Sequence, residues 1–127
     1  MKTILVDAVY AFVSDKGEIY QPLFELLEKY PNRKILLTGG NDEQVEKWRL
    51  KQMPYEFFTL KHNPEKTDPK YYETMLEHFG LRPEEVMYFE HNMEAVKSAE
   101  STGIVTHFYD QDKKDLEGLK SFLDKNL

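Results

Sequence analysis

Short, mainly apolar runs alternate along the chain with longer segments in which apolar residues recur every three or four positions. The runs cover residues 4–6, 34–38, 56–60, 86–89 and 104–108. Each run is bounded by polar or turn-forming residues and is too short for a helix, so each predicts a β-strand. Apolar runs of this kind are typical of parallel strands that are covered on both faces.

The segments between these runs predict helices, and several of their ends carry capping residues. Pro22 opens a helix whose leucines lie at helical spacing as far as Tyr30. Asp68 followed by Pro69 is typical of a helix start, and Gly80 is typical of a helix end. Further helices are predicted after residues 41–42, around residues 96–99 and from Asp112 onward.

Strands that alternate with helices at this spacing predict βαβ units and a mainly parallel sheet. We therefore expect one α/β domain over residues 1–127, with a five-stranded sheet between two helical layers. Ligands of such sheets bind beyond the carboxyl ends of the strands. The candidates for chemistry are the residues that follow the strands: Asp7, Thr38, the segment 61–66 and the segment 90–92.

Composition narrows the classes of partner. The net charge is -6 and the 17 Lys and Arg residues are scattered, which argues against nucleic acid. No segment is long and apolar enough for a signal peptide or a membrane span, so we expect a soluble, cytoplasmic protein without a membrane partner. The absence of cysteine excludes disulfides and thiolate chemistry. The four histidines lack the spacing of a zinc site.

The candidate residues occur in an order that resembles the haloacid-dehalogenase (HAD) superfamily. That superfamily has an Asp after its first strand, a Thr or Ser after its second, a Lys before a later helix and acidic residues after its fourth strand. The match is most specific in KTDPKYY at residues 66–72 and FGLRPEEVMYF at residues 79–89. The resemblance covers nearly the whole chain and implies a HAD-like Rossmannoid three-layer sandwich. The short segments after the first and third strands imply no separate cap domain.

The resemblance also implies roles for individual residues. Asp7 matches the catalytic nucleophile, and Thr38 with Gly39 matches the phosphate-binding turn. Lys66 matches the lysine that steadies both the nucleophile and the phosphate. Asp7 and Glu90 match ligands of a magnesium ion. Simpler explanations stay open: a structural carboxylate at Asp7, a strand-ending turn at Thr38 and a solvated loop lysine at Lys66.

Several positions depart from the superfamily pattern. Val9 occupies the place of the general acid and cannot carry a proton. After Glu90, where further acidic residues belong, the chain has His91 and Asn92. Magnesium prefers hard oxygen ligands, so histidine is a poor substitute. Glu94 would point around its helix away from the site, although one turn of slippage would bring it back. We therefore expect magnesium to bind weakly if at all.

We interpret the sequence as a HAD-like hydrolase-fold protein whose magnesium-dependent phosphatase chemistry is impaired or lost, and which acts as a non-catalytic binding or regulatory module. The alternative is a divergent phosphatase-like hydrolase that uses Asp7 as nucleophile. The expected partner is a phosphorylated small molecule or, for a binding module, another protein. We also expect His91 to face Asp7 and to take over part of the electrostatic role of the metal.

Overall fold

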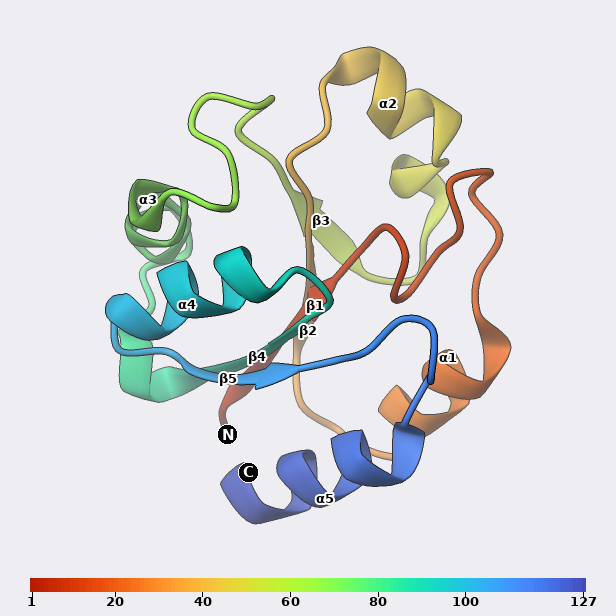
Figure 1. The fold of residues 1–127 in the computed structure, drawn as a ribbon, viewed down its shortest axis with the longest axis vertical. Helices are drawn as coiled ribbons and strands as arrows, with labels where there is room; N and C mark the ends of the chain where they lie inside the picture. Colours follow the sequence, from red (N-terminus) through yellow and green to blue (C-terminus); the bar gives the residue numbers. More distant parts are fainter.

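A computed structural model describes all of residues 1–127 and shows a five-stranded sheet with helices on both faces (Figure 1). Every adjacent pair of strands is parallel, which confirms the predicted α/β sandwich. Because β1 is central, the residues that follow it lie beside those that follow both of its neighbours. In spatial order the strands are β3 (Glu56–Phe58), β2 (Lys34–Leu37), β1 (Thr3–Asp7), β4 (Val86–Glu90) and β5 (Val105–Phe108).

The helices begin and end largely at the capping residues that the sequence indicates. The Asp68 side chain accepts a hydrogen bond from the Lys70 amide at 2.9 Å, and Gly80 adopts a φ of 66° where the same helix ends. Asn41 forms a reciprocal capping box with Gln44. The helices are α1 (Gln21–Leu27), α2 (Asp42–Lys47), α3 (Pro69–Phe79), α4 (Met93–Ser101) and α5 (Leu116–Asn126), with 3-10 turns η1 (Leu50–Gln52) and η2 (Pro83–Glu85).

Two predicted helix limits are wrong. The last helix begins after Asp115 and not at Asp112, because the Asp115 side chain caps it by accepting from the Gly118 amide at 2.9 Å. Asp112 lies in the preceding turn. The first helix ends at Leu27 and not at Tyr30, which precedes a proline and is therefore disfavoured in the helical region.

The side chains of β1 point alternately to the two faces of the sheet and pack in a separate core on each face. Ile4 and Val6 are fully buried in a core with residues of α1 and α5. Leu5 is fully buried in the other core with residues of α3 and α4. Figure 1 shows the same division, with α3 and α4 on one side of the sheet and α1 and α5 on the other. Buried on both faces, β1 is a rigid support for the residues at its carboxyl end.

The segment between β1 and α1 folds back as a compact loop and not as a separate cap domain. Ala8, Phe12 and Val13 anchor it, since all three are buried in the α1 and α5 core. No separate cap domain covers the carboxyl edge of the sheet, as the sequence predicts. None of the helices is long and apolar enough to cross a membrane.

Candidate functional site

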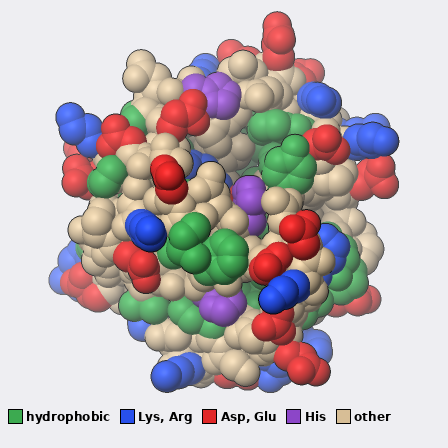
Figure 2. Space-filling model, viewed as in Figure 1, with side chains coloured by type: hydrophobic (Ala, Val, Ile, Leu, Met, Phe, Trp, Pro, Cys, Tyr) green, Lys and Arg blue, Asp and Glu red, His purple; other side chains and the backbone are tan.

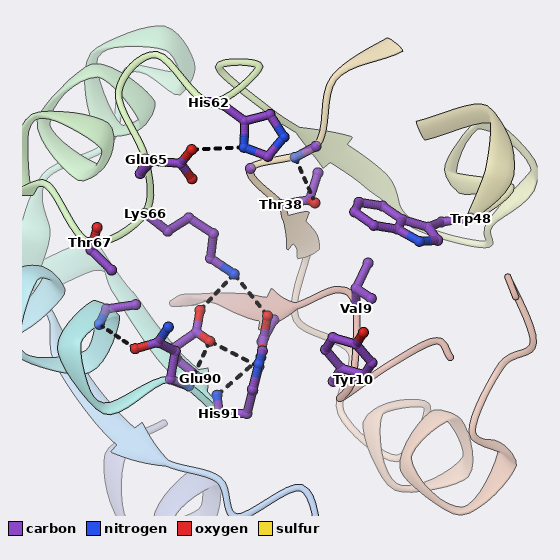
Figure 3. Close-up of a pocket in the computed structure, with 15 residues that line it drawn as sticks. Val9, Tyr10, Thr38, Trp48, His62, Glu65, Lys66, Thr67, Glu90 and His91 are labelled. Atoms are coloured by element: carbon purple, nitrogen blue, oxygen red, sulfur yellow. Dashed lines mark hydrogen bonds and ion pairs between the residues drawn. The ribbon is translucent and has the colours of Figure 1, made fainter. Parts of the chain in front are cut away.

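Two buried carboxylates from adjacent strands meet at the carboxyl edge of the sheet. Asp7 ends β1 and Glu90 ends β4, and the two residues are 1% and 0% exposed. Lys66, in the loop before α3, reaches both (Figure 3): its Nζ lies 2.8 Å from Asp7 Oδ1 and 2.6 Å from Glu90 Oε1. Lys66 also donates to the Leu37 carbonyl at 3.3 Å. It is an ion-pair partner within the site and not a solvated loop lysine.

His91 places a second basic group against the same carboxylates. Its Nδ1 is hydrogen-bonded to Asp7 Oδ2 and lies 3.1 Å from Glu90 Oε2. Its backbone N–H also donates to Asp7 Oδ2, at 3.0 Å. His91 therefore faces Asp7, as the sequence predicts. We refer to Asp7, Lys66, Glu90 and His91 as the ion quartet.

Every oxygen of Glu90 has two hydrogen-bond donors or cations beside it. The Tyr88 hydroxyl donates to Oε1, which Lys66 also contacts. The Asn92 backbone N–H donates to Oε2 at 3.0 Å, and His91 lies beside the same oxygen. A carboxylate this deeply buried is stable only when it is paired and hydrogen-bonded. Groups of the protein itself thus supply all the hydrogen bonds and counter-charges that the buried Glu90 carboxylate needs.

Protonation in the quartet follows from burial and from these contacts. Burial lowers the pKa of His91, but its hydrogen bonds to Asp7 and Glu90 outweigh this and raise the pKa to about 10. Burial also opposes the charge on Lys66, yet the two carboxylates hold the pKa of Lys66 well above its usual range. Both groups are therefore cations at neutral pH.

The pKa values of the Asp7 and Glu90 carboxyls shift in opposite directions. Burial raises the pKa of Glu90, but Lys66 and the bond from His91 bring it below its usual range. Burial raises the pKa of Asp7, and the Glu90 charge raises it further, against Lys66 and His91. Asp7 and His91 thus compete for one proton. The second carboxylate beside His91 Nδ1 favours the imidazolium, so the quartet holds two anions and two cations.

The ion quartet offers a magnesium ion few suitable ligands. The ligand atoms of Asp7, Glu90 and His91 lie within 4.8 Å of one another, but only two of these side chains offer oxygen. Magnesium demands nearly octahedral coordination by hard oxygen ligands. Both carboxylates already bond Lys66 and His91, which a metal would have to displace. Glu94 cannot supply the missing oxygen, because it is exposed and does not line the pocket.

The turn after β2 provides polar groups that the protein itself does not use. Thr38 Oγ1 accepts from the Gly40 N–H at 3.2 Å, as a strand-ending turn requires. The hydroxyl proton of Thr38 and the backbone N–H of Gly39 have no acceptor in the protein. The Tyr71 hydroxyl holds the turn in place by donating to the Thr38 carbonyl at 2.7 Å. Thr38 and Gly39 therefore offer two donors to a ligand.

These groups line one open pocket of about 310 Å³. Figure 2 shows a hollow in the surface, rimmed by apolar, acidic and histidine side chains. Eight predicted residues line it: Asp7, Val9, Thr38, Gly39, Lys66, Glu90, His91 and Asn92. The structure thus brings these eight residues to one pocket, whereas Lys61, Asn63 and Pro64 of the predicted segment 61–66 do not line it.

Seven further residues line the pocket, and the sequence singles out none of them for a role: Tyr10, Gly40, Trp48, His62, Glu65, Thr67 and Ala95. His62 and Glu65 lie within the predicted segment 61–66. His62 Nδ1 lies 2.9 Å from Glu65 Oε1, and this spacing of three residues within the segment 61–66 was an available signal. Tyr10 and Trp48 carry no comparable signal, because loops and a short helix with a thin apolar face bring them to the pocket.

The departures from the superfamily pattern have distinct structural consequences. Val9 is 8% exposed and lines the pocket without any polar group. Asn92 caps α4, its Oδ1 accepting from the amides of Glu94 at 2.9 Å and Ala95 at 3.3 Å. His91 closes the ion quartet. Of the three, only His91 adds a charged group to the site.

Comparison with solved structures places this geometry in a known architecture. A HAD family enzyme from Bacteroides thetaiotaomicron, solved as a magnesium complex, aligns with a TM-score of 0.63 at 15% identity over 85% of this chain and 92% of that chain. D,D-heptose 1,7-bisphosphate phosphatase from Burkholderia thailandensis aligns with a TM-score of 0.59 at 10% identity over 90% and 83%. The chain has the HAD-type fold.

The UTR4 protein of Saccharomyces cerevisiae has the same architecture, with a TM-score of 0.58 at 18% identity over 73% of this chain. This chain spans only 48% of the length of that protein. No protein-family model matches the sequence, and no curated protein sequence matches it significantly. At these identities the likeness establishes the fold alone, and function rests on the site.

Proposed function

We propose that this protein is a metal-independent binding module on the HAD-type fold, which holds a phosphorylated small molecule and has lost magnesium-dependent phosphatase chemistry. The observation that carries the proposal is the position of His91 Nδ1, bonded to Asp7 and 3.1 Å from Glu90. An imidazolium there neutralises the carboxylates, which is the task of a divalent cation in a metal-dependent phosphatase.

Charge balance explains how an anion could approach two carboxylates without a metal. Lys66 and His91 compensate Asp7 and Glu90, so the quartet itself presents no unpaired negative charge to a phosphoryl group. Beyond them, the Thr38 hydroxyl, the Gly39 N–H and the unpartnered Nε2 of His91 are donors at the pocket lining. Oriented donors of this kind bind phosphate without a net positive patch.

The same contacts oppose catalysis by Asp7. Each of its oxygens is engaged by a cation, Oδ1 by Lys66 and Oδ2 by His91, which lowers its nucleophilicity. No general acid stands at Val9 to protonate a leaving group, and general acid catalysis contributes about 10²–10⁴-fold. Both deficits act on the same step, so a bound phosphomonoester would persist.

The second candidate is a divergent hydrolase with Asp7 as nucleophile. The observation in its favour is the 2.8 Å pair between Lys66 Nζ and Asp7 Oδ1, since a lysine at this place can steady a phosphoryl group in transfer. Under this alternative the protein would turn over an aryl phosphate, and Asp7→Asn would abolish the turnover.

One set of measurements on the full chain separates the two. We expect calorimetry to show that inorganic phosphate binds equally with and without magnesium, and that Thr38→Val weakens binding about tenfold. Thr74→Val is the matched control, because Thr74 is exposed on α3 and outside the pocket. No hydrolysis of 4-nitrophenyl phosphate is expected. A micromolar dissociation constant for magnesium, or turnover that Asp7→Asn abolishes, would contradict the proposal.

A further inference from the structure

The two sides of the pocket differ in chemistry. Figure 3 shows Trp48, Val9 and Tyr10 along one side, and Glu65, Lys66 and Thr67 along the other. The first side offers two aromatic rings and a valine, while the second is polar. At about 310 Å³ the pocket is near the lower limit of small-molecule sites, which begin at about 300 Å³. It has room for a ligand of about one ring and one charged group.

The aromatic side is built by close packing on the turn after β2. A Cβ at Gly40 would lie 2.5 Å from Trp48 Cζ3 and 3.3 Å from Cε3, so the indole rests directly on the Gly40 backbone. The buried indole N–H of Trp48 has no acceptor in the protein. Packing alone therefore positions Trp48, and it places the ring against Gly40, in the same pocket as Thr38 and Gly39.

Tyr10 completes this side at a cost in backbone conformation. Its φ is 74°, in the left-handed region that tyrosine rarely adopts. The residue is nevertheless 48% exposed, and its ring contacts the His91 ring edge-on, with centroids 5.6 Å apart. A strained backbone that presents a large ring to solvent gains little stability from that ring. Strain of this kind is typical of sites shaped for a ligand.

We propose that the ligand is a small aromatic phosphomonoester, whose ring lies against Trp48 and Tyr10 and whose phosphoryl group meets Thr38, Gly39 and His91. This assignment rests on the proposed function and narrows it to a substrate class. An aliphatic phosphate would leave both rings exposed, and an aromatic compound without phosphate would leave the donors of the turn unused. Aromatic contacts of this kind strengthen binding by up to about tenfold per ring pair.

Trp48 is the only tryptophan in the chain and reports directly on the aromatic side. Phenyl phosphate, inorganic phosphate and phenol are the probes, with affinities from calorimetry and ring contact from Trp48 fluorescence. We expect phenyl phosphate to bind about tenfold tighter than inorganic phosphate and to change Trp48 emission. Phenol is expected to bind more weakly than either.

Variants at Tyr10 measure what its ring contributes to binding. Tyr10→Ala should weaken phenyl phosphate about tenfold and inorganic phosphate much less, while Tyr10→Phe should retain the parent affinity for both. Val105→Ala is the matched control, since Val105 is 44% exposed on β5 and lies outside the pocket. If Tyr10→Ala bound phenyl phosphate as tightly as the parent does, the assignment of the aromatic side would be wrong.

The same probes test the aromatic side of the pocket separately from the proposed phosphate binding. Equal affinities for phenyl phosphate and inorganic phosphate would overturn the aromatic assignment and leave the phosphate-binding module standing. Binding of neither probe would overturn both. Phenol binding as tightly as phenyl phosphate would show that the phosphoryl donors are unused. A phosphotyrosine peptide that bound far tighter than phenyl phosphate would overturn the assignment to a small molecule.

Discussion

The ring and the backbone amide of His91 donate to the same oxygen of Asp7, the ring through Nδ1 and the amide at 3.0 Å. The backbone bond fixes where the side chain begins, and the ring then has only a short distance to cover. His91 is therefore held against Asp7 more firmly than a free side chain would be. This doubled contact makes His91 the residue on which the charge balance of the quartet depends.

The first prediction concerns the titration of His91. We expect its ring protons, followed by NMR against pH, to titrate near a pKa of about 10, and Asp7→Asn to lower that pKa because it removes the nearest negative charge. His107 is an internal control, since burial lowers its pKa and Asp7 is not among the causes. A His91 titration near the reference value of about 6.5, unchanged in Asp7→Asn, would rule out the ion quartet.

The second prediction is that the raised pKa of His91 makes the free energy of unfolding depend on pH. The folded-state pKa of His91 lies above its unfolded value, so its contribution to the free energy of unfolding is full below about pH 6.5 and is lost as the pH rises through about 10. Urea denaturation of the parent should therefore show stability falling between pH 7 and 9 more steeply than in His91→Gln. Parallel curves for the two proteins would contradict this linkage.

The strands, and the order of the candidate residues that follow them, could be predicted because each strand is marked by a local apolar run. Asp7, Thr38 and Glu90 follow such runs directly, and parallel topology places the ends of adjacent strands together. Lys66 was found through its sequence context before α3. These positions depend on secondary structure and topology, both of which leave a periodic signal in the sequence.

The aromatic side of the pocket could not be predicted in this way. Tyr10 lies in an irregular loop and reaches the pocket because its own backbone is in the left-handed region. Trp48 follows a helix of six residues and is placed by packing on Gly40. Neither position follows from hydrophobic periodicity. The start of α5 is ambiguous in the sequence because Asp112 and Asp115 are both acceptable caps, and in the structure Asp115 caps the helix by accepting from the Gly118 amide.

The third prediction tests how tightly Trp48 is held. Gly40→Ala would bring a Cβ within 2.5 Å of the indole, so the ring must move, and overpacking of this kind costs about 1–3 kcal/mol of unfolding free energy. Gly39→Ala is the matched control, because its Cβ would meet Glu65 at 3.5 Å, an ordinary contact. We expect Trp48 emission to shift in Gly40→Ala alone. Identical emission and stability in both variants would contradict the packing described for Trp48.

The fourth prediction reverses the departures from the superfamily pattern. In Val9→Asp with His91→Asp, a carboxylate replaces the imidazolium beside Asp7 and Glu90, and another occupies the place of the general acid. Without metal, the four carboxylates at positions 7, 9, 90 and 91 repel one another, and the variant should be less stable than the parent. Magnesium should restore that stability, because the site then offers three oxygen ligands.

The same double variant should hydrolyse 4-nitrophenyl phosphate faster than the parent when magnesium is present, by up to about 10²–10⁴-fold if the new acid functions. Val9→Asn with His91→Asn is the matched control, since it makes similar changes in size without adding a carboxylate. Thermal unfolding with and without magnesium is the second readout, and it does not depend on activity. If magnesium stabilised the Asp variant no more than the Asn variant, the proposal that His91 takes the place of the metal would be wrong.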